Sequence, residues 1–594
     1  MPGMQAKYPQ SPQAGAYSNP ANRIRIATIH RCSEIIRKLY DMHPTTISSL
    51  DGITDQMAWL RDYSYEEIQR QFQQALKRCY MSAYEHRHNL SEQTVPTQTL
   101  NFVRKIVHAF GVGSGKGSQG HCGFYSTTVE FLAQRNNAVH QDPEFRQTRV
   151  KVSADFEESL LPNMKLIALI TKLKNWINIL GQKKKLMPTT YLMEDKCRFL
   201  SNFSQHTADV EIPGDALMPK STPYYVRIAR FIPEVKVVEK HNTAARRILI
   251  RGHNGKVYPY LVLNDSCLSD TRREERVLQL LRLLNQYLVN KKETGRRYLQ
   301  FTSPRVVAIN PGLRLVEDNV SSLSLIDILK RRINRNKSTN CDMDQDTPVR
   351  EYYERLIKLQ SLGAPSTNRN LVDIYSGIQN RIVPETMLKD WASQTYANAT
   401  DYWVFRSQFT YQLAMFCLCE YAFLLTSLMP DSMYVHQDTG CINVSFFKFD
   451  QYEINESQTN GSGSGRDDRT KLVPFRLTPN LAEFMTRTGI VGPFRGALDS
   501  VSRCLTTPQK RLISIFKAIL HDEMLFWQKK GQESFESHTI IEMVNRVVEK
   551  MYKRLREIGG TNDSPLESGA TRLISEATSV DNLSLMDPAW HPWL

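Results

Sequence analysis

The sequence predicts an α+β protein in which a small strand-rich region is followed by a larger helical region. Three observations support this prediction. Apolar residues recur three or four positions apart within residues 51–84, which is the spacing of an amphipathic helix. Short runs rich in β-branched residues then occupy residues 224–309, as is typical of strands. From Ser321 onward helical patterns dominate, so we expect the strands to form a small lobe of their own.

We expect the first helices after a disordered lead-in at residues 1–25, which are rich in Pro, Gln, Ser and Ala. The apolar stripe of residues 51–84, with one break near Tyr63, consists of Ile53, Met57, Leu60, Ile68, Phe72, Leu76 and Tyr80. A second amphipathic helix is predicted at residues 164–186. Its lysine run, 183–185, lies at the C-terminal end, where the helix dipole favours cations.

The strand-rich region contains four candidate strands, at residues 224–231, 246–252, 257–262 and 305–309. The tripeptide His253-Asn254-Gly255 separates two of them and is a tight-turn signal, so residues 246–262 are predicted to form a β-hairpin. A helix is predicted at residues 272–290.

The helical region begins with more helices and includes a long apolar segment, residues 403–428, that is expected to be a core helix. A turn at Asp438-Thr439-Gly440 precedes a candidate strand at 443–449. Helices are expected to resume through Arg556, and a polar linker separates them from a last segment, residues 571–594.

The charge balance is a weak functional signal. Lysine and arginine number 76 against 61 acidic residues, a formal net charge of +15, which fits work near nucleic acid or acidic partners. The basic runs at 183–185, 246–251 and 330–335 are predicted to be solvated faces. Since no DNA-binding motif is present, we expect no direct DNA binding. A module that binds nucleic acid through this positive charge remains an alternative hypothesis.

Cysteine spacing excludes several classes of protein. None of the ten cysteines forms a CxxC pair, so zinc knuckles and a disulfide framework are not expected, and the thiols are predicted to be reduced in the cytosol or nucleus. The N-terminus has no apolar signal region, and no run of eighteen apolar residues occurs. We therefore expect no membrane partner.

Several segments together resemble the phosphatidylinositol-3-kinase-related kinases. The segments KVYPYLVLND (256–265) and REERVLQLLRLLN (273–285) resemble the small lobe of these kinases. VPFRLTPNL (473–481) resembles the end of their activation segment, and DNLSLMDPAWHPWL (581–594) resembles their closing FATC element. The resemblance implies a bilobal PI3/PI4-kinase-like fold with a β-rich N-lobe and a larger helical C-lobe.

Other segments are similar to one branch of that superfamily, the transformation/transcription domain-associated protein (TRRAP) family. They are DKCRFLSNFS (195–204), HNTAARRILIRGHNGKVYPYLV (241–262), LVEDNVSSLSL (315–325) and DPAWHPWL (587–594). The resemblance covers nearly the whole chain, from about Ile36. It implies four parts: a helical FAT end with an FRB-like segment at 26–160, an N-lobe with its preceding helix at 161–316, a C-lobe at 317–558, and FATC at 559–594.

Kinase chemistry requires four chemical parts: a strand lysine for phosphates, a catalytic-loop Asp, and an Asn and a second Asp for magnesium. By local register, these positions hold Leu263, Ser427, Ser432 and Phe446 respectively. Leucine cannot neutralise phosphate, and serine is not basic near neutral pH. We therefore predict a pseudokinase with no catalytic residues, no nucleotide cofactor and no metal site.

Some features leave alternatives open. Asp438 and Asn443 have the Asp-x4-Asn spacing of protein kinases, but the first is interpreted as a turn residue. An active Ser/Thr kinase of the same superfamily is therefore the alternative function. Asp431 and Asp450 are interpreted as solvated loop or capping residues. The loop at 239–247 has no glycine, although its Arg246 and Arg247 are candidates to meet an anion.

The resemblance also implies a biological role. Members of this family are scaffold subunits of SAGA-type and nucleosome-acetyltransferase-type histone acetyltransferase complexes, which link transcription activators to chromatin acetylation in the nucleus. The expected partners are other subunits of those complexes. Activators are expected to bind mainly through a helical solenoid that this chain lacks. Trp590 and Trp593 are expected to pack the last segment on the C-lobe.

Overall fold

The computed structural model describes residues 20–60, 65–85, 93–110, 143–156, 164–186, 188–218, 224–241, 243–264, 268–310, 313–336, 347–362, 367–426, 428–445, 447–450, 473–506, 509–531, 537–559 and 569–594. Its contacts divide the chain into two compact units. The smaller unit comprises Met1–Arg61, Thr190–Val235 and Ile248–Tyr258, and the larger comprises Asp62–Thr189, Lys236–Arg247 and Pro259–Leu594. Each unit is described by itself.

The smaller unit combines helices with short strands. Its elements are α2 (Pro20–Met42), α3 (Pro44–Trp59), β1 (Thr190–Leu192), α9 (Met193–Lys196), α10 (Arg198–Asn202) and β2 (Ile228–Phe231). Helix α2 begins before the predicted end of the lead-in at residue 25, and residues 1–19 lie outside the described part. Helix α10 packs closely on α3, since a Cβ on Gly52 would lie 2.7 Å from the ring of Phe199.

The predicted hairpin at residues 246–262 is confirmed. Strands β4 (Thr243–Gly252) and β5 (Val257–Asn264) are neighbours in the sheet. The Gly252 N–H donates to the Lys256 carbonyl over 2.8 Å, and Gly255 has a φ of +81°, which glycine adopts without steric cost. The candidate strand at 224–231 forms only as β2, whose Phe231 pairs with Ile250 of β4.

The larger unit contains the parts of this sheet outside Thr190–Val235 and Ile248–Tyr258, together with a second, smaller sheet. The strands β3 (Glu234–Lys240), β4, β5, β7 (Leu313–Glu317) and β6 (Val306–Asn310) follow one another in that order. Neither β3 nor β7 was predicted from the sequence. The second sheet has the order β10 (Ile442–Val444), β9 (Met433–His436) and β8 (Ser322–Ser324), all antiparallel.

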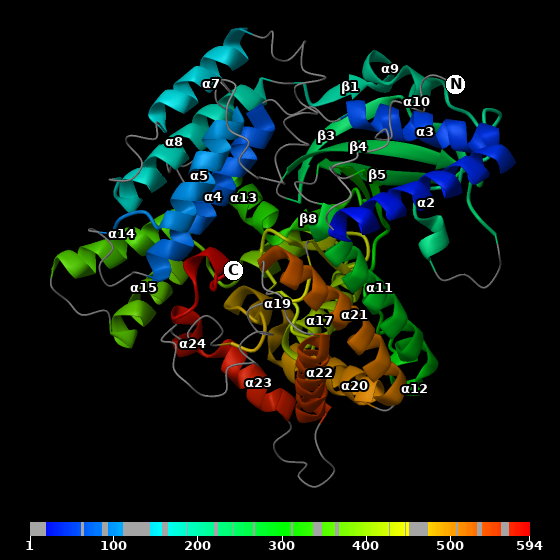
Figure 1. The fold of residues 1–594 in the computed structure, drawn as a ribbon. Helices are drawn as coiled ribbons and strands as arrows, with labels where there is room; N and C mark the ends of the chain where they lie inside the picture. Colours follow the sequence, from blue (N-terminus) through cyan, green and yellow to red (C-terminus); the bar gives the residue numbers. More distant parts are fainter. Residues whose placement is uncertain are drawn as a thin grey trace. The chain divides into compact units, whose positions relative to one another are not determined.

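Helices make up most of the larger unit (Figure 1). Those toward the N-terminus are α4 (Tyr65–Glu85), α5 (Thr97–Phe110), α7 (Pro143–Asp155) and α8 (Leu166–Lys185). Those that follow are α11 (Leu268–Asn290), α12 (Lys292–Gly295), α13 (Leu325–Asn336), α14 (Thr347–Ser361), α15 (Asn368–Arg381), α16 (Met387–Thr395), α17 (Ala399–Ala422), α19 (Pro479–Gly489), η6 (Ile490–Phe494), α20 (Arg495–Thr506), α21 (Gln509–Gly531), α22 (Ser537–Gly559), α23 (Gly569–Thr578), α24 (Val580–Ser584) and η7 (Pro588–Trp590).

The two amphipathic helices predicted from periodicity are paired. Helix α4 packs along α8 (Figure 1), and the stripe residues Phe72 and Leu76 are buried, as are Leu169 and Leu173 of α8. The apolar face of each helix is therefore covered by the other. Within the described ranges, no helix is long and apolar enough to cross a membrane.

The long core helix is shorter than predicted. Helix α17 is buried along most of its length but ends at Ala422, before the predicted end at residue 428. Beyond it, Leu424 has a φ of +55°, and the chain pairs with the segment after β10, where Leu425 bridges Phe449. Backbone hydrogen bonding to this segment replaces helix hydrogen bonds, which an apolar pattern alone does not reveal.

Candidate functional site

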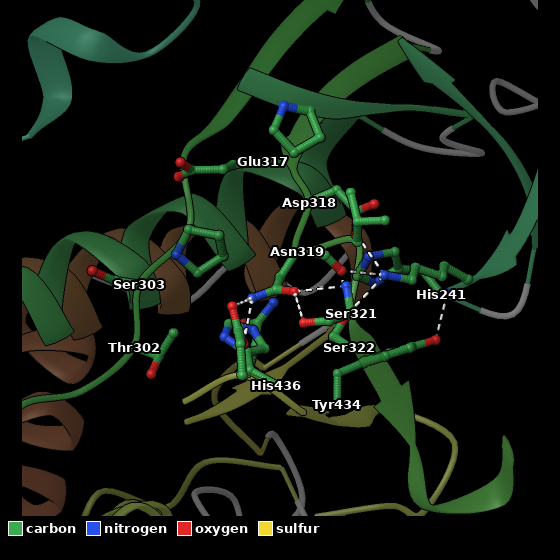
Figure 2. Close-up of a pocket in the computed structure, with 16 residues that line it drawn as sticks. His241, Thr302, Ser303, Glu317, Asp318, Asn319, Ser321, Ser322, Tyr434 and His436 are labelled. Atoms are coloured by element: carbon green, nitrogen blue, oxygen red, sulfur yellow. Dashed lines mark hydrogen bonds and ion pairs between the residues drawn. The ribbon is translucent and has the colours of Figure 1, made fainter. Parts of the chain in front are cut away.

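A cavity of about 600 Å³ lies in the larger unit, where the turn after β3, the segment from β7 to β8, and the β9–β10 hairpin meet (Figure 2). We call it the inter-sheet cavity. It is lined by Lys240, His241, Pro259, Thr302, Ser303, Pro304, Glu317, Asp318, Asn319, Val320, Ser321, Ser322, Tyr434, His436, Asp438 and Asn443. Lys240 and His241 belong to the loop at 239–247 that was considered from sequence as an anion-binding loop, and they line this cavity. Leu263 and Ser432, at predicted kinase positions, are not among its lining residues.

Lys240, at the end of β3, is engaged by groups of the chain itself. Its Nζ donates to Asp318 Oδ1 at 2.6 Å, to Ser322 Oγ at 2.7 Å and to the Asn319 carbonyl at 2.8 Å. An ammonium has three donors, so all are used. Burial lowers the pKa of Lys240, and the carboxylate of Asp318 opposes that shift.

Asp318 joins two cations. Its second oxygen, Oδ2, accepts from Arg247 Nε at 2.7 Å, and the Asp318 side chain is only 3% exposed. From the sequence, Arg247 was considered as a ligand for an external anion. In the structure it binds the Asp318 carboxylate of the same chain. Because both carboxylate oxygens are used, this ion-pair triad closes one wall of the inter-sheet cavity.

His241 occupies the turn between β3 and β4. Its backbone N–H donates to the Tyr434 hydroxyl at 2.7 Å (Figure 2), and its Nδ1 shares a hydrogen bond with Ser445 Oγ. Burial, together with the nearby cations Arg314 and Lys240, lowers the pKa of His241 from 6.5 to about 3. The ring is therefore neutral, and it tethers the glycine-free turn to the second sheet.

Leu263, at the predicted strand-lysine position, is buried on β5 directly opposite Arg314 of β7. Arg314 is itself buried and forms an ion pair with Glu274 of α11. A strand-to-helix ion pair is thus present beside Leu263, but its cation comes from the neighbouring strand. The sequence analysis did not single out Arg314.

Of the other three positions at which kinase residues were expected, the structure describes only Ser432. Ser427 and Phe446 lie outside the described residues. Ser432 is buried, and its hydroxyl donates to the Met429 carbonyl at 3.1 Å. The Ser432 carbonyl accepts from the Ser445 N–H at 2.8 Å, which ties the loop before β9 to the end of β10. Across the described ranges, no group of three or more His, Cys, Asp and Glu side chains is arranged to hold a metal ion.

Asp438 and Asn443, the pair with kinase-like spacing, both line the inter-sheet cavity. The turn interpretation of Asp438 is confirmed, because it lies between β9 and β10 near Gly440, whose φ is +72°. The Asp438 oxygens accept from Asn319 Nδ2 at 3.2 and 3.3 Å.

Asp431 does not behave as predicted. Instead of being solvated, its side chain is 18% exposed and forms an ion pair with Lys77 of α4. An acid in the loop before β9 therefore contacts the helix that the resemblance assigned to the FRB-like segment. Asp450 is half-buried, and its N–H donates to the Leu424 carbonyl at 2.8 Å.

Arg476 holds the last segment of the chain. Its guanidinium donates to four main-chain oxygens, those of Leu428 (3.1 Å), Trp590 (2.8 Å), His591 (3.1 Å) and Leu594 (3.0 Å). It also lies 4.2 Å from the ring centroid of Trp590. The prediction that Trp590 and Trp593 pack against the helical region is confirmed, since they are 4% and 1% exposed.

Comparison with known proteins explains this architecture. The family model "Phosphatidylinositol 3- and 4-kinase" matches residues 266–529, and the FATC domain model matches residues 565–594. The chain is 46% identical over 605 residues to the transformation/transcription domain-associated protein of Danio rerio, covering 100% of this chain and 15% of the relative. The chain belongs to the TRRAP family. It spans about 15% of the length of this relative.

More distant relatives extend the match. The "SAGA complex/NuA4 acetyltransferase complex subunit TRA1" of Saccharomyces cerevisiae is 29% identical over 458 residues, covering 75% of this chain and 12% of the relative. The structure titled "FAT and kinase domain of CtTel1" is similar with a TM-score of 0.50 at 16% identity, covering 88% of this chain and 34% of that chain. The fold is therefore that of the phosphatidylinositol-3-kinase-related superfamily.

The residues that define the site were largely missed from sequence. Lys240, Arg314, Asp318 and Arg476 are buried charges that each bond to groups distant in the chain. One signal was available: a charged residue inside an apolar strand, as in GLRLVE (312–317), needs a buried partner. The sequence does not name that partner, because Glu274 and Arg314 meet only through the fold.

Proposed function

We propose that this chain is a non-catalytic scaffold part of nuclear histone acetyltransferase complexes of the SAGA and nucleosome acetyltransferase types, which link transcription activators to chromatin acetylation. The names of the yeast relatives, which are SAGA and NuA4 complex subunits, support the assembly role. The expected partners are other subunits of such a complex. The nuclear location follows from chromatin as the substrate of the complex.

The observation that carries the non-catalytic part is the internal bonding around the inter-sheet cavity. Phosphoryl transfer depends on cationic side chains that are free to bind phosphate and on side chains that are free to bind magnesium. Here Lys240 and Arg247 are both paired with Asp318, and a leucine occupies the predicted strand-lysine position. Because these side chains bond to one another, we interpret the cavity as a structural junction and not as a nucleotide-binding site.

The alternative is an active Ser/Thr kinase, in which Asp438 and Asn443 would take the places of the missing catalytic-loop Asp and magnesium-binding Asn. The contact of Asp438 with Asn319 weighs against this, since both carboxylate oxygens already accept hydrogen bonds. A nucleic-acid-binding module carried by the +15 charge is the remaining reading. Binding to duplex DNA that weakens steeply with salt would favour it.

Two measurements test the proposal. Thermal melting of the chain with and without magnesium-ATP should give the same midpoint, and radioactive phosphate should not transfer to a peptide. A clear rise in the midpoint together with labelling would establish the kinase instead. Affinity purification of the tagged chain from nuclei should recover acetyltransferase subunits, and their absence would contradict the scaffold role.

A further inference from the structure

A second, smaller cavity of about 190 Å³ lies in the larger unit between helices α13 and α16. Its floor is apolar, and one wall carries three arginines of α13. The floor residues are Ile328, Met387 and Trp391, and the wall residues are Arg331, Arg332 and Arg335. We call it the arginine groove. It is separate from the residues that line the inter-sheet cavity.

Of the three arginines of this groove, Arg331 and Arg332 are the candidates to bind a ligand. Arg335 is already engaged within the chain, since it donates to the amide oxygen of Gln394 on α16. In the described part of the chain, Arg331 and Arg332 have no ion pair. The acid of the first turn of α13, Asp327, lies 3.5 Å from Lys330 instead. Positive charge is therefore concentrated beside an apolar floor.

The opposite wall limits what can bind. Asp390 of α16 lines the groove, and its Oδ2 accepts from Thr386 Oγ1 at 3.0 Å. A continuous row of phosphates would meet this carboxylate and be repelled. A peptide can instead place an apolar side chain on the floor and direct its carboxylates only toward the arginines. The small volume also suits one side chain better than a nucleic-acid strand.

We propose that the arginine groove binds an acidic peptide segment of a partner protein, with one apolar side chain in the cavity and flanking carboxylates on Arg331 and Arg332. The planar guanidinium fork binds carboxylates in a bidentate manner, which suits arginine better than lysine for this contact. Charge complementarity selects the partner, and the apolar floor fixes its register. This site goes beyond the proposed scaffold function and does not depend on the loss of catalysis.

Fluorescence anisotropy with the full chain tests the groove. The probe is a labelled peptide with a central leucine flanked on both sides by aspartates, measured at about 0.15 M salt so that long-range attraction is screened. Arg331→Glu and Arg332→Glu should each weaken binding by roughly tenfold, because an attraction becomes a repulsion. The matched control is Arg546→Glu on the exposed face of α22, which changes the net charge equally.

Two peptide controls keep the test independent of folding. Replacing the central leucine of the peptide by asparagine should weaken its binding by removing the contact with the apolar floor. Replacing the aspartates by asparagines should weaken its binding by removing the contacts with the arginines. The proposal is overturned if the peptide does not saturate the chain, if Arg546→Glu weakens binding as much as Arg332→Glu, or if duplex DNA binds the groove more tightly than the peptide does.

Discussion

Lys240 Nζ lies 2.6 Å from Asp318 Oδ1, and both side chains are almost completely buried. The pair connects the end of β3 to the segment between β7 and β8, which are far apart in sequence. Arg247 shares the same carboxylate. The carboxylate therefore compensates two buried cations, and this relationship leads to the first prediction.

Asp318→Asn should destabilise the chain by about 3 kcal/mol or more, because it leaves two buried cations without a compensating charge. The matched control is Glu483→Gln, whose Lys389 partner is also 2.6 Å away but lies in an exposed pair. That change should have a much smaller effect on stability, because solvent screens an exposed pair. Urea unfolding measures both.

The double variant Lys240→Met/Asp318→Asn should be more stable than Asp318→Asn alone, since one uncompensated charge is removed. If Asp318→Asn and Glu483→Gln have the same effect on the unfolding midpoint, the buried triad does not stabilise the junction.

Leu263→Lys should destabilise the chain instead of restoring nucleotide binding. The new ammonium would be buried opposite Arg314, whose charge is already paired with Glu274. We expect a loss of roughly 2 kcal/mol or more, whereas Leu263→Met should cost less than about 1.5 kcal/mol. Melting curves with and without magnesium-ATP provide the measurement. A nucleotide-dependent rise in the Leu263→Lys variant would show that leucine alone blocks binding.

Arg476→Lys should release the last segment of the chain. A lysine ammonium cannot span the four main-chain oxygens that the guanidinium reaches. Limited proteolysis followed by mass spectrometry should show faster cleavage within residues 569–594. The control Arg487→Lys, in the last turn of α19 and outside this contact, should leave the cleavage rate unchanged. Equal rates in both variants would contradict the anchoring role of Arg476.

Acid should destabilise the chain through its buried histidines. Burial, aided by Arg476, lowers the pKa of His591 from 6.5 to about 3. Between these values the unfolded chain binds a proton that the folded chain does not, so stability is present above pH 6.5 and is lost as pH falls toward 3. The slope is about 1.4 kcal/mol per pH unit for this residue.

A His591→Gln variant isolates this contribution to acid sensitivity. Its unfolding free energy should fall less steeply below pH 6.5 than that of the unchanged chain. His538→Gln is the control, because the His538 side chain is 81% exposed on α22. Parallel pH profiles for the unchanged chain and His591→Gln would exclude a neutral buried His591.

Gly440→Ala should destabilise the β9–β10 hairpin for two reasons. Gly440 has a φ of +72°, and an added Cβ would lie 2.6 Å from the Phe405 carbonyl oxygen. We expect a cost of about 2 kcal/mol or more. Gly492→Ala is the control, since a Cβ there meets nothing within 4 Å. If both variants melt at the same temperature, the close approach at Gly440 is not limiting.

Local sequence patterns predicted much of the fold. The stripes of α4 and α8, the turn at Gly255 and the strand β5 are confirmed, because each depends on residues that are neighbours in the chain. Strands β3 and β7 were not predicted from the sequence. Their charges, on Lys240 and Arg314, are compensated by partners that periodicity does not reveal.

The sequence by itself determined the helices α4 and α8, the turn at Gly255, the strand β5 and the family, because periodicity and long motifs are local properties of the chain. The tertiary structure alone decided which charges pair: Lys240 with Asp318, Arg314 with Glu274, Lys77 with Asp431. The physical reason is that a buried charge is stable only next to a partner, and folding brings these partners together from 78, 40 and 354 residues apart in the chain.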